Sequence, residues 1–597
     1  IDSSDDDSSS DESPVPSKRP RADTYGISKK LMTNMGHKPG RGLGKFEHGR
    51  VEPVQASTQK GRRGLGLKPS VVGDVPQDFK WSSDDTLPLA TEEVVSLLHI
   101  VRYTLDGDDL EKWLKKGPKK LTIDDETDFV DPQILKGIVN SKTIFDNLDG
   151  EDMRTARSRS NPYETIGSVI FLNRAAVKMA NMDAILDFMF TSPKKQNGEP
   201  AVDKRDLLYF ADVCAGPGGF SEYVFYRKGW RAKGFGFTLK SSKDFKLSDF
   251  YAGTPETFNP YYGVNDDGNI FDPANLSSLK DHVLKHTEDI GVHFLMADGG
   301  FSVEGQENIQ EILSKQLYLC QCLAALMLVR TGGHFVVKLF DVFTHFSVGI
   351  VYIMYRCFEE VCIHKPVTSR PANSERYLIC KWKKLGTEAA EKHLFSVNSM
   401  LWNNRTGDDD VVELVPLSVI QEDSGFYEYI YKSNCIIGEK QIKNLLKIAE
   451  FSKDKTLIDE NQADMKEQCL KLWKIAREYR GEGGKQIRSK ALHVIDAMVL
   501  GGIDISDMPL TERVNQCILF CNALEKPDDA QALPIRCKRF FNLESFSTAI
   551  ANLEYRVMKR IKKALTVDVP KRGQRNEMFY EIGSLLFIKE IKGMSDT

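Results

Sequence analysis

Four charged residues in the middle of the chain stand in local contexts that suit proton transfer. Lys178 lies in NRAAVKMANMD, Asp298 in FLMADGGF, Lys338 in GGHFVVKLFD and Glu375 in SRPANSERYLIC. Lys338 falls within an apolar, strand-like run, where a lysine needs a partner or a function. A lysine accepts a proton from a hydroxyl group only if desolvation or a neighbouring cation lowers its pKa. We therefore predict Lys338 as a general base, Lys178 as its like-charged neighbour, and the two acids as groups that orient the lysines.

Each of these residues also has an ordinary structural explanation when it is taken alone. A single lysine is usually a solvated surface residue, and Asp298 before two glycines suits a turn. Glu375 also suits an ion pair with Arg376 or Arg370 on an exposed strand. The joint occurrence of all four residues favours a catalytic set.

A glycine-rich segment, ADVCAGPGGFSEYV (211–224), lies between the first and second of these residues. It follows an apolar run and opens a helical pattern, so its glycines allow a sharp turn and the helix amino terminus adds positive potential. A glycine-rich turn of this kind is equally compatible with dinucleotide binding. However, a dinucleotide site expects an acid after the second strand, and that run ends in FGFTLK. Asp212 before the turn and Pro217 within it favour S-adenosylmethionine.

The elements that must position these residues alternate between strands and helices from about Phe145 to Lys384. The predicted strands are 207–214, 232–239, 292–298, 333–340 and 375–382, and a long apolar helix is predicted at 309–329. This alternation predicts an α/β fold, a Rossmann-like doubly wound sheet whose active site lies at the carboxyl ends of the strands.

The composition describes an ordinary globular protein of two to four domains, with 597 residues, 41% of them hydrophobic and 28% charged. A net charge of −4 does not indicate a nucleic-acid binder, although part of the acidity lies in the first dozen residues. The eleven cysteines show no CxxC pair and no zinc spacing, so we expect reduced thiols in an intracellular protein and no metal site. We expect no membrane span and no signal peptide.

The chain divides into five predicted segments. These are an acidic then basic disordered tail (1–22), a glycine-rich segment (23–69), a linker (70–90), a catalytic domain (91–390) and a mixed α/β region (391–597). The tail is either a solvated segment or a nuclear localisation signal beside modifiable serines. Within the last region, FYEYIYKSNCII is predicted as a strand and KQIKNLLKIAEF as a helix.

Two family resemblances follow from these motifs. Residues 145–384 resemble the FtsJ-type (RrmJ) ribose 2′-O-methyltransferases, whose Lys-Asp-Lys-Glu tetrad the four residues match in order and context. The segments MGHKPGRGLGK and GLGLK resemble a G-patch, which implies a DEAH-box RNA helicase as partner. The resemblance implies S-adenosylmethionine as the only cofactor and a ribose 2′-hydroxyl as the methyl acceptor.

Together with the G-patch, the segments FADVCAGPGGFSEYV, FLMADGGFSVEGQENIQEIL and KPVTSRPANSERY indicate the cap-methylating members of the family. They imply methylation of the first transcribed nucleotide of capped mRNA, a nuclear location and an association with the RNA polymerase II transcription machinery. Three alternatives stay open: methylation of the second nucleotide, methylation of another RNA ribose, and a catalytically idle RNA-processing adaptor.

The resemblance also assigns binding residues. The predicted cofactor contacts are Arg157, Asn173, Cys214, Ala215, Gly216, Pro217, Gly218, Gly219, Phe220, Asn269 and Ile270. The predicted substrate contacts are Lys142, Thr143, Ile144, Phe145, Asp146, Asn308, Ile309, Gln310 and Asn373. In NDDGNI, Asn269 stands where family members often place an aspartate. Arg154 and the run TARSRSNPYE that follows it, with Arg157 and Arg159, predict three phosphate ligands.

The region after 390 resembles in part the inactive guanylyltransferase-like module of these enzymes. IKNLLKIAEF and NQADMKEQCLKLW match its beginning, and RGEGGKQIRSKALHVIDAMVL matches a later part. There is no KxDG motif between 390 and 597, so no second enzymatic activity is expected.

Overall fold

The computed structural model describes most of the chain from residue 79 to residue 524. The described ranges are 79–82, 88–99, 105–143, 150–203, 205–301, 303, 306–404, 407, 409–475 and 497–524, with short strands at 493–494, 536–537, 564–566 and 579–581. The predicted tail and G-patch lie outside the described residues, and so do Ile144, Phe145 and Asp146.

An eight-stranded sheet forms the centre of the fold, with the strand order β1-β8-β9-β7-β6-β3-β4-β5. Its strands are β1 (Leu97–Leu98), β3 (Leu208–Val213), β4 (Ala232–Phe237), β5 (Phe258–Tyr261), β6 (Val292–Ala297), β7 (Val329–Leu339), β8 (Phe358–His364) and β9 (Arg376–Lys383). Strands β3 to β7 are parallel, whereas β9 runs antiparallel to both β7 and β8. The strand order reverses between β3 and β6, and a crevice at such a point is the usual ligand site of an open α/β sheet.

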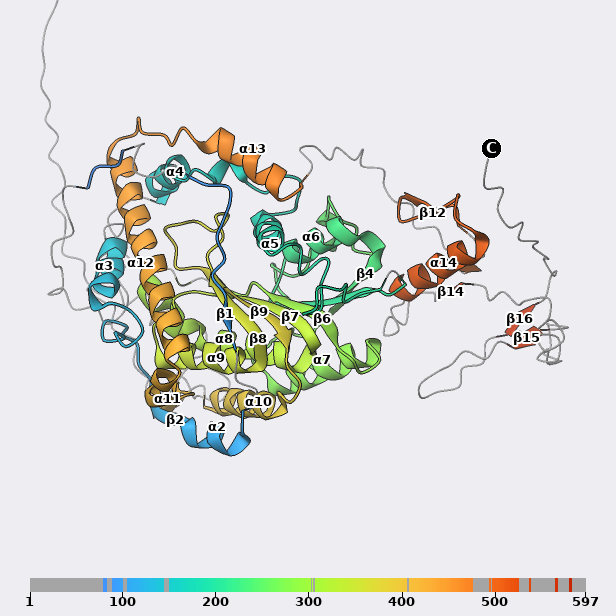
Figure 1. Cartoon of the computed structure of the whole chain (residues 1–597), viewed down its shortest axis with the longest axis horizontal. Coiled ribbons are helices and arrows are strands. Elements are labelled where there is room, and N and C mark those ends of the chain that lie inside the picture. Colours follow the sequence, from blue (N-terminus) through green and yellow to red (C-terminus); the bar gives the residue numbers. More distant parts are fainter. Residues whose placement is uncertain are drawn as a thin grey trace, which may run out of the picture. The chain divides into compact units, whose positions relative to one another are not determined.

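Helices cover both faces of this sheet (Figure 1). One face carries α5 (Arg174–Ile185) and α6 (Gly219–Lys228), and the other carries α7 (Pro273–His286), α8 (Gln310–Leu328), α9 (His345–Cys357) and α10 (Glu388–Asn403). Side chains alternate along β3 accordingly: Phe210 belongs to the cluster that contains Val177 and Tyr223 on the first face, and Ala211 to the cluster that contains Leu323 on the other. The strands read as continuous apolar runs because both faces are buried.

All five predicted strands and the long apolar helix are present, and the α/β fold class is confirmed. β7 begins four residues before its predicted start. Three strands of the sheet, β1, β5 and β8, were not predicted, and β1 has only two residues. β5 has only four residues and contains Pro260. β8 begins FEEV, and its two acids interrupt the apolar pattern by which a buried strand is predicted.

The strand predicted at FYEYIYKSNCII is wrong, because these residues lie in α12 (Ser424–Lys453), a helix of 30 residues. Aromatic and β-branched residues favour strands locally. The buried positions Phe426, Ile430, Asn434, Ile437 and Gln441 recur instead every three or four residues, which places them on one helical face.

Helix α12 packs against α3 (Pro132–Thr143) and α4 (Gly150–Ser160). Two glycines allow the close approach to α3: a Cβ on Gly438 would lie 2.6 Å from Ile134 Cγ2, and one on Gly137 would lie 2.7 Å from Ile442 Cδ1. Towards its end, Leu445 and Ile448 of α12 bury Ala156 of α4. Helix α12 therefore holds α3 and α4 in place, and these two short helices carry predicted substrate contacts.

The predicted boundary at residue 390 falls inside one packed core. Leu394 of α10 and Phe426 of α12 belong to the cluster on the α8 face of the sheet, and Trp473 is fully buried in the cluster on the α5 face. The catalytic body thus continues to about Ile475.

Smaller elements complete the described structure. They are α2 (Gly107–Trp113), α11 (Leu417–Glu422), α13 (Gln462–Leu472), α14 (Leu510–Leu524), the 3-10 turns η3 (Glu164–Ile166), η4 (Gly229–Arg231), η5 (Leu247–Asp249) and η6 (Glu307–Ile309), and the strand pairs β2 (Lys115–Pro118) with β10 (Asp409–Glu413), β11 (His493–Val494) with β14 (Arg536–Cys537), β12 (Val499–Leu500) with β13 (Ile503–Asp504) and β15 (Ala564–Thr566) with β16 (Phe579–Glu581). None of the described helices is both long and apolar enough to cross a membrane.

Candidate active site

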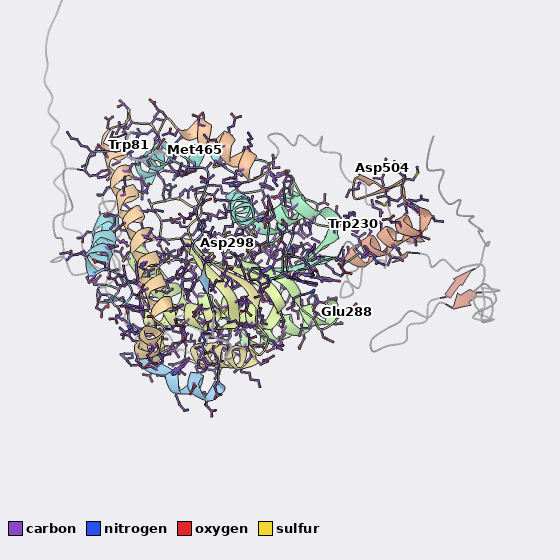
Figure 2. The ribbon with its side chains drawn as sticks, viewed as in Figure 1. Trp81, Trp230, Glu288, Asp298, Met465 and Asp504 are labelled. Atoms are coloured by element: carbon purple, nitrogen blue, oxygen red, sulfur yellow. The ribbon has the colours of Figure 1, made fainter. Side chains whose placement is uncertain are left out.

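Three of the four predicted catalytic residues reach one edge of the sheet through strand geometry alone. Asp298 follows β6 directly, and Lys338 is the penultimate residue of β7. Because β9 is antiparallel to β7, its first residue Arg376 pairs with Leu339, which brings the preceding Glu375 to the same edge. Asp298 marks this edge in Figure 2.

The fourth residue, Lys178, comes from helix α5 and closes the cluster. Its Nζ lies 2.9 Å from each carboxylate oxygen of Glu375. Lys338 Nζ lies 3.1 Å from Asp298 Oδ1 and donates a 2.8 Å hydrogen bond to Asp298 O. The Tyr377 hydroxyl donates to Asp298 Oδ1 at 2.9 Å, and Lys178 Nζ lies 5.9 Å from the centre of the same ring. The four side chains therefore converge, as two ion pairs with Tyr377 between them.

The charges of the cluster act on one another. Burial favours the neutral amine of Lys178, but Asp298 and Glu375 outweigh it and raise the pKa of that lysine above its usual range. Burial likewise favours the neutral acid of Glu375, but Lys178 and Lys338 outweigh it and lower its pKa to about 2. Burial, with Asp298 and Glu375, raises the pKa of Tyr377 far above its ordinary value. Lys178 and Glu375 are thus a charged pair at neutral pH, and Tyr377 is a neutral hydroxyl donor.

The predicted cofactor loop, Cys214–Phe220, connects β3 to α6 at the same edge. Gly218 has φ +107° and precedes the first turn of α6, a conformation that favours glycine. A Cβ on Gly216 would lie 1.9 Å from Lys243 O, and one on Gly219 would lie 2.1 Å from Asn173 Oδ1. These glycines are needed for close packing within the protein, in addition to any approach of a ligand.

The comparisons with known proteins agree with this geometry. Residues 171–383, which contain all four tetrad positions, match the FtsJ-like methyltransferase family, and residues 24–68 match the G-patch domain. The cap-specific mRNA (nucleoside-2′-O-)-methyltransferase 1 of Danio rerio is 43% identical, over 89% of this chain and 77% of that protein. The proteins of the same name from Homo sapiens (42% identical, 89% and 76%) and Drosophila melanogaster (40% identical, 94% and 85%) are also similar.

The chain belongs to the cap-specific mRNA (nucleoside-2′-O-)-methyltransferase 1 family. It is an S-adenosylmethionine-dependent methyltransferase with a G-patch, as the sequence predicts.

For a methyltransferase of this family, the residues beneath the cofactor loop fit a bound donor. Asp212 is fully buried; Ser221 Oγ donates to its Oδ2 at 2.6 Å, and its Oδ1 has no hydrogen-bond partner among the described residues. Burial raises the pKa of Asp212 well above its ordinary value. An unpaired polar atom next to a helix amino terminus suits a ligand that carries both charges, such as the methionine end of S-adenosylmethionine.

Several other residues that are predicted to contact the donor already use some of their polar atoms within the protein. Asn173 caps α5, where its Oδ1 accepts from Ala175 N at 2.9 Å. Phe220 and Ile270 are buried. Asn269 Oδ1 accepts from Phe271 N at 3.1 Å, which leaves the amide nitrogen of Asn269 as its group for an adenine edge. Burial raises the pKa of the Cys214 thiol to about 12.

The predicted substrate contacts lie around the tetrad. Lys142 at the end of α3 donates to Glu307 O at 3.4 Å, and its Nζ lies 3.5 Å from Asp341 Oδ2. Asn308 and Ile309 are buried in η6, and the Asn308 Oδ1 is unpartnered within the described part of the chain. Thr143 and Gln310 lie at the end of α3 and the start of α8, and Asn373 is exposed beside Glu375.

A basic cluster surrounds a single acid, Glu164. Arg174 Nη1 and Arg370 Nη2 lie 2.7 and 3.5 Å from Glu164 Oε1. Burial and the neighbouring Arg370 lower the pKa of Arg157, and Arg154 adds to this repulsion. Among the described residues, Arg154, Arg157, Arg174 and Arg370 thus bring more positive charge to this place than Glu164 neutralises, which suits phosphate.

The prediction for Arg159 is not supported by its position. Its guanidinium donates to three main-chain carbonyls, those of Phe451, Asp454 and Leu457, at and just after the end of α12. Arg159 therefore caps the carboxyl end of α12.

Sequence reasoning missed Tyr377, Arg174 and Arg370 as members of this site. The alternation of a strand was the available signal for Tyr377, because residues 375 and 377 share one face of the sheet. The alternative partners of Glu375 are also excluded, since Arg376 pairs with Asp341 at 2.8 Å and Arg370 with Glu164. Nothing in the sequence alone joins Arg174 to Arg370.

Proposed function

We propose that this chain transfers the methyl group of S-adenosylmethionine to the ribose 2′-hydroxyl of the first transcribed nucleotide of capped mRNA. The observation that carries the proposal is the convergence of Lys178, Asp298, Lys338 and Glu375 beside the glycine loop. The proposed substrate is that of the similar cap-specific mRNA methyltransferases, which match 89% and 94% of this chain.

Lys338 is the base in the proposed mechanism. Bound S-adenosylmethionine supplies an already activated methyl group, so the protein must position the hydroxyl and remove its proton. Lys178 is held as a cation by Glu375 and Asp298, so we assign the base to Lys338, which lies against Asp298. Lys338 acts as the neutral amine: its ammonium proton passes to solvent before the reaction, and Nζ then accepts the proton of the hydroxyl group. Proton transfer of this kind contributes about 10²- to 10⁴-fold to a rate.

The remaining residues hold the geometry. Asp298 contacts Lys338 through both its carboxylate and its carbonyl, and Tyr377 donates to the same carboxylate. These contacts allow few orientations of the Lys338 ammonium group. Holding base, hydroxyl and donor in line supplies several kcal/mol of the barrier.

The basic cluster around Glu164 is proposed to hold RNA phosphates. Arg154, Arg157, Arg174 and Arg370 come from α4, α5 and the loop before β9, and the Arg370 Nε is buried without a partner among the described residues. Arg157 is also predicted to contact the donor, and the two roles separate experimentally by their salt dependence.

The test is methylation of capped and uncapped RNA by the wild type and by Lys338→Ala, with the modified nucleotide identified by mass spectrometry. We expect a 2′-O-methyl group on the first nucleotide of capped RNA only, and at least an approximately 100-fold lower rate in the variant. An unchanged rate in the variant would overturn the mechanism. Methylation of uncapped RNA, or of the second nucleotide, would overturn the substrate.

The G-patch supports a second part of the proposal, binding of a DEAH-box RNA helicase in the nucleus beside the transcription machinery of RNA polymerase II. Its support is the match of residues 24–68 to the G-patch domain. We expect a purified nuclear DEAH-box helicase to bind the full chain, and to lose binding when Leu43 and Leu65 are both replaced by Asp. Equal binding by this double variant would contradict the role of the G-patch.

A further inference from the structure

Lys365 is a lysine that the proposed mechanism does not use, although it lies against the tetrad. It directly follows β8 and is half-buried. Its Nζ donates three hydrogen bonds: to Asn373 O at 2.7 Å, to Asn373 Oδ1 at 2.8 Å and to Glu375 O at 2.6 Å. One ammonium group therefore uses all three of its protons on two residues of the same loop.

This loop, residues 366–375, carries three groups of the site. Arg370 belongs to the basic cluster, Asn373 is a predicted substrate contact, and Glu375 pairs with Lys178. The rest of the loop is fixed through other residues: Val367 N donates to Glu92 Oε1 at 2.9 Å, and Thr368 Oγ1 donates to Asn181 Oδ1 at 3.0 Å. Lys365 holds the end of the loop that enters the tetrad.

We propose that Lys365 is a positioning residue for methyl transfer: its three hydrogen bonds set the backbone before β9, and thereby place the Glu375 carboxylate against Lys178 and the Asn373 amide against the RNA. Lys365 acts through Glu375 and Asn373 and touches neither substrate nor donor. The inference rests on the proposed function, since it assumes that the tetrad is the reacting centre.

The charged groups that face Lys365 explain why its hold depends on pH. Glu375 and Asp341 favour its ammonium form, whereas Arg376 and Lys178 oppose it. Burial is the largest influence and lowers the pKa of Lys365 to about 7. Above that pH the neutral amine has two protons for three acceptors, so the loop is held less firmly. Below that pH all three bonds are made.

The test compares Lys365→Met, which removes the donors but keeps the length of the side chain, with Lys365→Arg, which keeps a permanent cation. The matched control is Lys381→Met. Lys381 lies on β9 and pairs with Glu360 of β8, so it joins the same region of the sheet away from the reacting edge.

With Lys365→Met, we expect kcat on capped RNA to fall about 30-fold, the donor Kd to stay within twofold, and Lys365→Arg to recover most of the loss, since a small misplacement at a reacting centre costs up to about 100-fold. The fall of kcat above pH 7 should be present in the wild type and absent in Lys365→Arg. The control should keep wild-type kcat.

Two results would overturn the proposal. One is a wild-type kcat in Lys365→Met. The other is a loss of kcat that Lys381→Met shares and that follows the melting temperature of both variants, because this would indicate general destabilisation. A failure of the proposed function is distinguishable, since it appears as full activity in Lys338→Ala.

Discussion

The loop predicted to hold the methyl donor is built from sequence neighbours, whereas the helices predicted to hold RNA are joined by residues about 300 positions apart. On the donor side, Cys214 N bonds Phe237 O, and Ser221 bonds Asp212 only nine positions away. On the RNA side, Arg159 reaches Phe451 across 292 positions, and Asn434 reaches Phe129 across 305. The donor site is therefore a local motif, and the RNA site depends on the packing of α12.

The tetrad lies where the two sides meet. Lys178 comes from α5, which packs beside the donor loop, and Glu375 comes from the loop on the RNA side. Damage to one side should leave the binding function of the other intact, and damage to the tetrad should affect both. Four predictions test this comparison, and they are ordered from the largest expected change in stability or binding to the smallest.

Glu375→Gln should have the largest effect, because it removes the carboxylate that directly pairs with the buried Lys178 ammonium. Removing one partner of a buried pair costs about 3 kcal/mol. Since the pKa of Glu375 is lowered to about 2, the stability from its charged form is present above pH 4.5 and is lost as the pH falls through about 2. Urea unfolding should show a difference from wild type that is constant near pH 7 and shrinks below pH 4.5.

The control for this experiment is Glu428→Gln, which removes an exposed carboxylate paired with Lys432. It should change stability little at any pH. A difference between Glu375→Gln and wild type that does not depend on pH would contradict the charged pair.

Gly216→Ala should break the donor side. The added Cβ would lie 1.9 Å from Lys243 O, so the loop or the neighbouring segment must move. We expect the affinity for the donor to fall about 100-fold, with RNA affinity within twofold of wild type. Calorimetric titration with donor and with capped RNA measures both.

Gly107→Ala is the matched substitution, since its Cβ meets nothing within 4 Å, and it should behave like wild type. If RNA affinity falls as steeply as donor affinity in Gly216→Ala, the two sides are not separable.

Asn434→Ala should break the RNA side. Asn434 is buried on α12; its Oδ1 accepts from Arg376 Nη1 at 2.9 Å, and its Nδ2 donates to Phe129 O and Val342 O. Leaving these groups unpaired costs about 2 kcal/mol. We expect a lower melting temperature and a raised KM for RNA, with the donor Kd unchanged.

Asn444→Ala on the same helix is the control, because within the described part of the chain its amide bonds only Lys440 O of its own helix. If Asn434→Ala shows a wild-type KM for RNA and a normal melting temperature, α12 does not hold the RNA side in place.

Arg157→Gln should have the smallest effect, and it distinguishes Arg157 from Arg159 on the same helix, α4. Loss of one phosphate contact should weaken RNA binding about tenfold and reduce the slope of log K against log salt by about one. Arg159→Gln should instead lower stability and leave the salt slope unchanged, because Arg159 bonds protein carbonyls. Equal salt slopes in Arg157→Gln and wild type would assign Arg157 to the donor alone.

The parts of the fold that sequence reasoning predicted are those with a strong local pattern. The strands that carry Asp298 and Lys338 are apolar runs whose ends can be recognised in the sequence, and the glycine loop stands directly between a strand and a helix. The failure at FYEYIYKSNCII has the opposite cause: its aromatic residues favour a strand, and only the packing of α12 on α3 decides for a helix. Arg159 was misjudged because a basic run has the same appearance whether it meets phosphate or carbonyl groups.

The sequence by itself determined the reaction. Two lysines, two acids and a glycine-rich turn indicate the donor and the base, because these depend on residue type and on nearby residues. Their resemblance to the FtsJ-type tetrad indicates the class of acceptor. Only the tertiary structure decided that Lys178 pairs with Glu375 and Lys338 with Asp298, and that Tyr377 and Lys365 support them. These partners come from separate strands and helices, and their contacts exist only after the sheet and its bracing helix have packed.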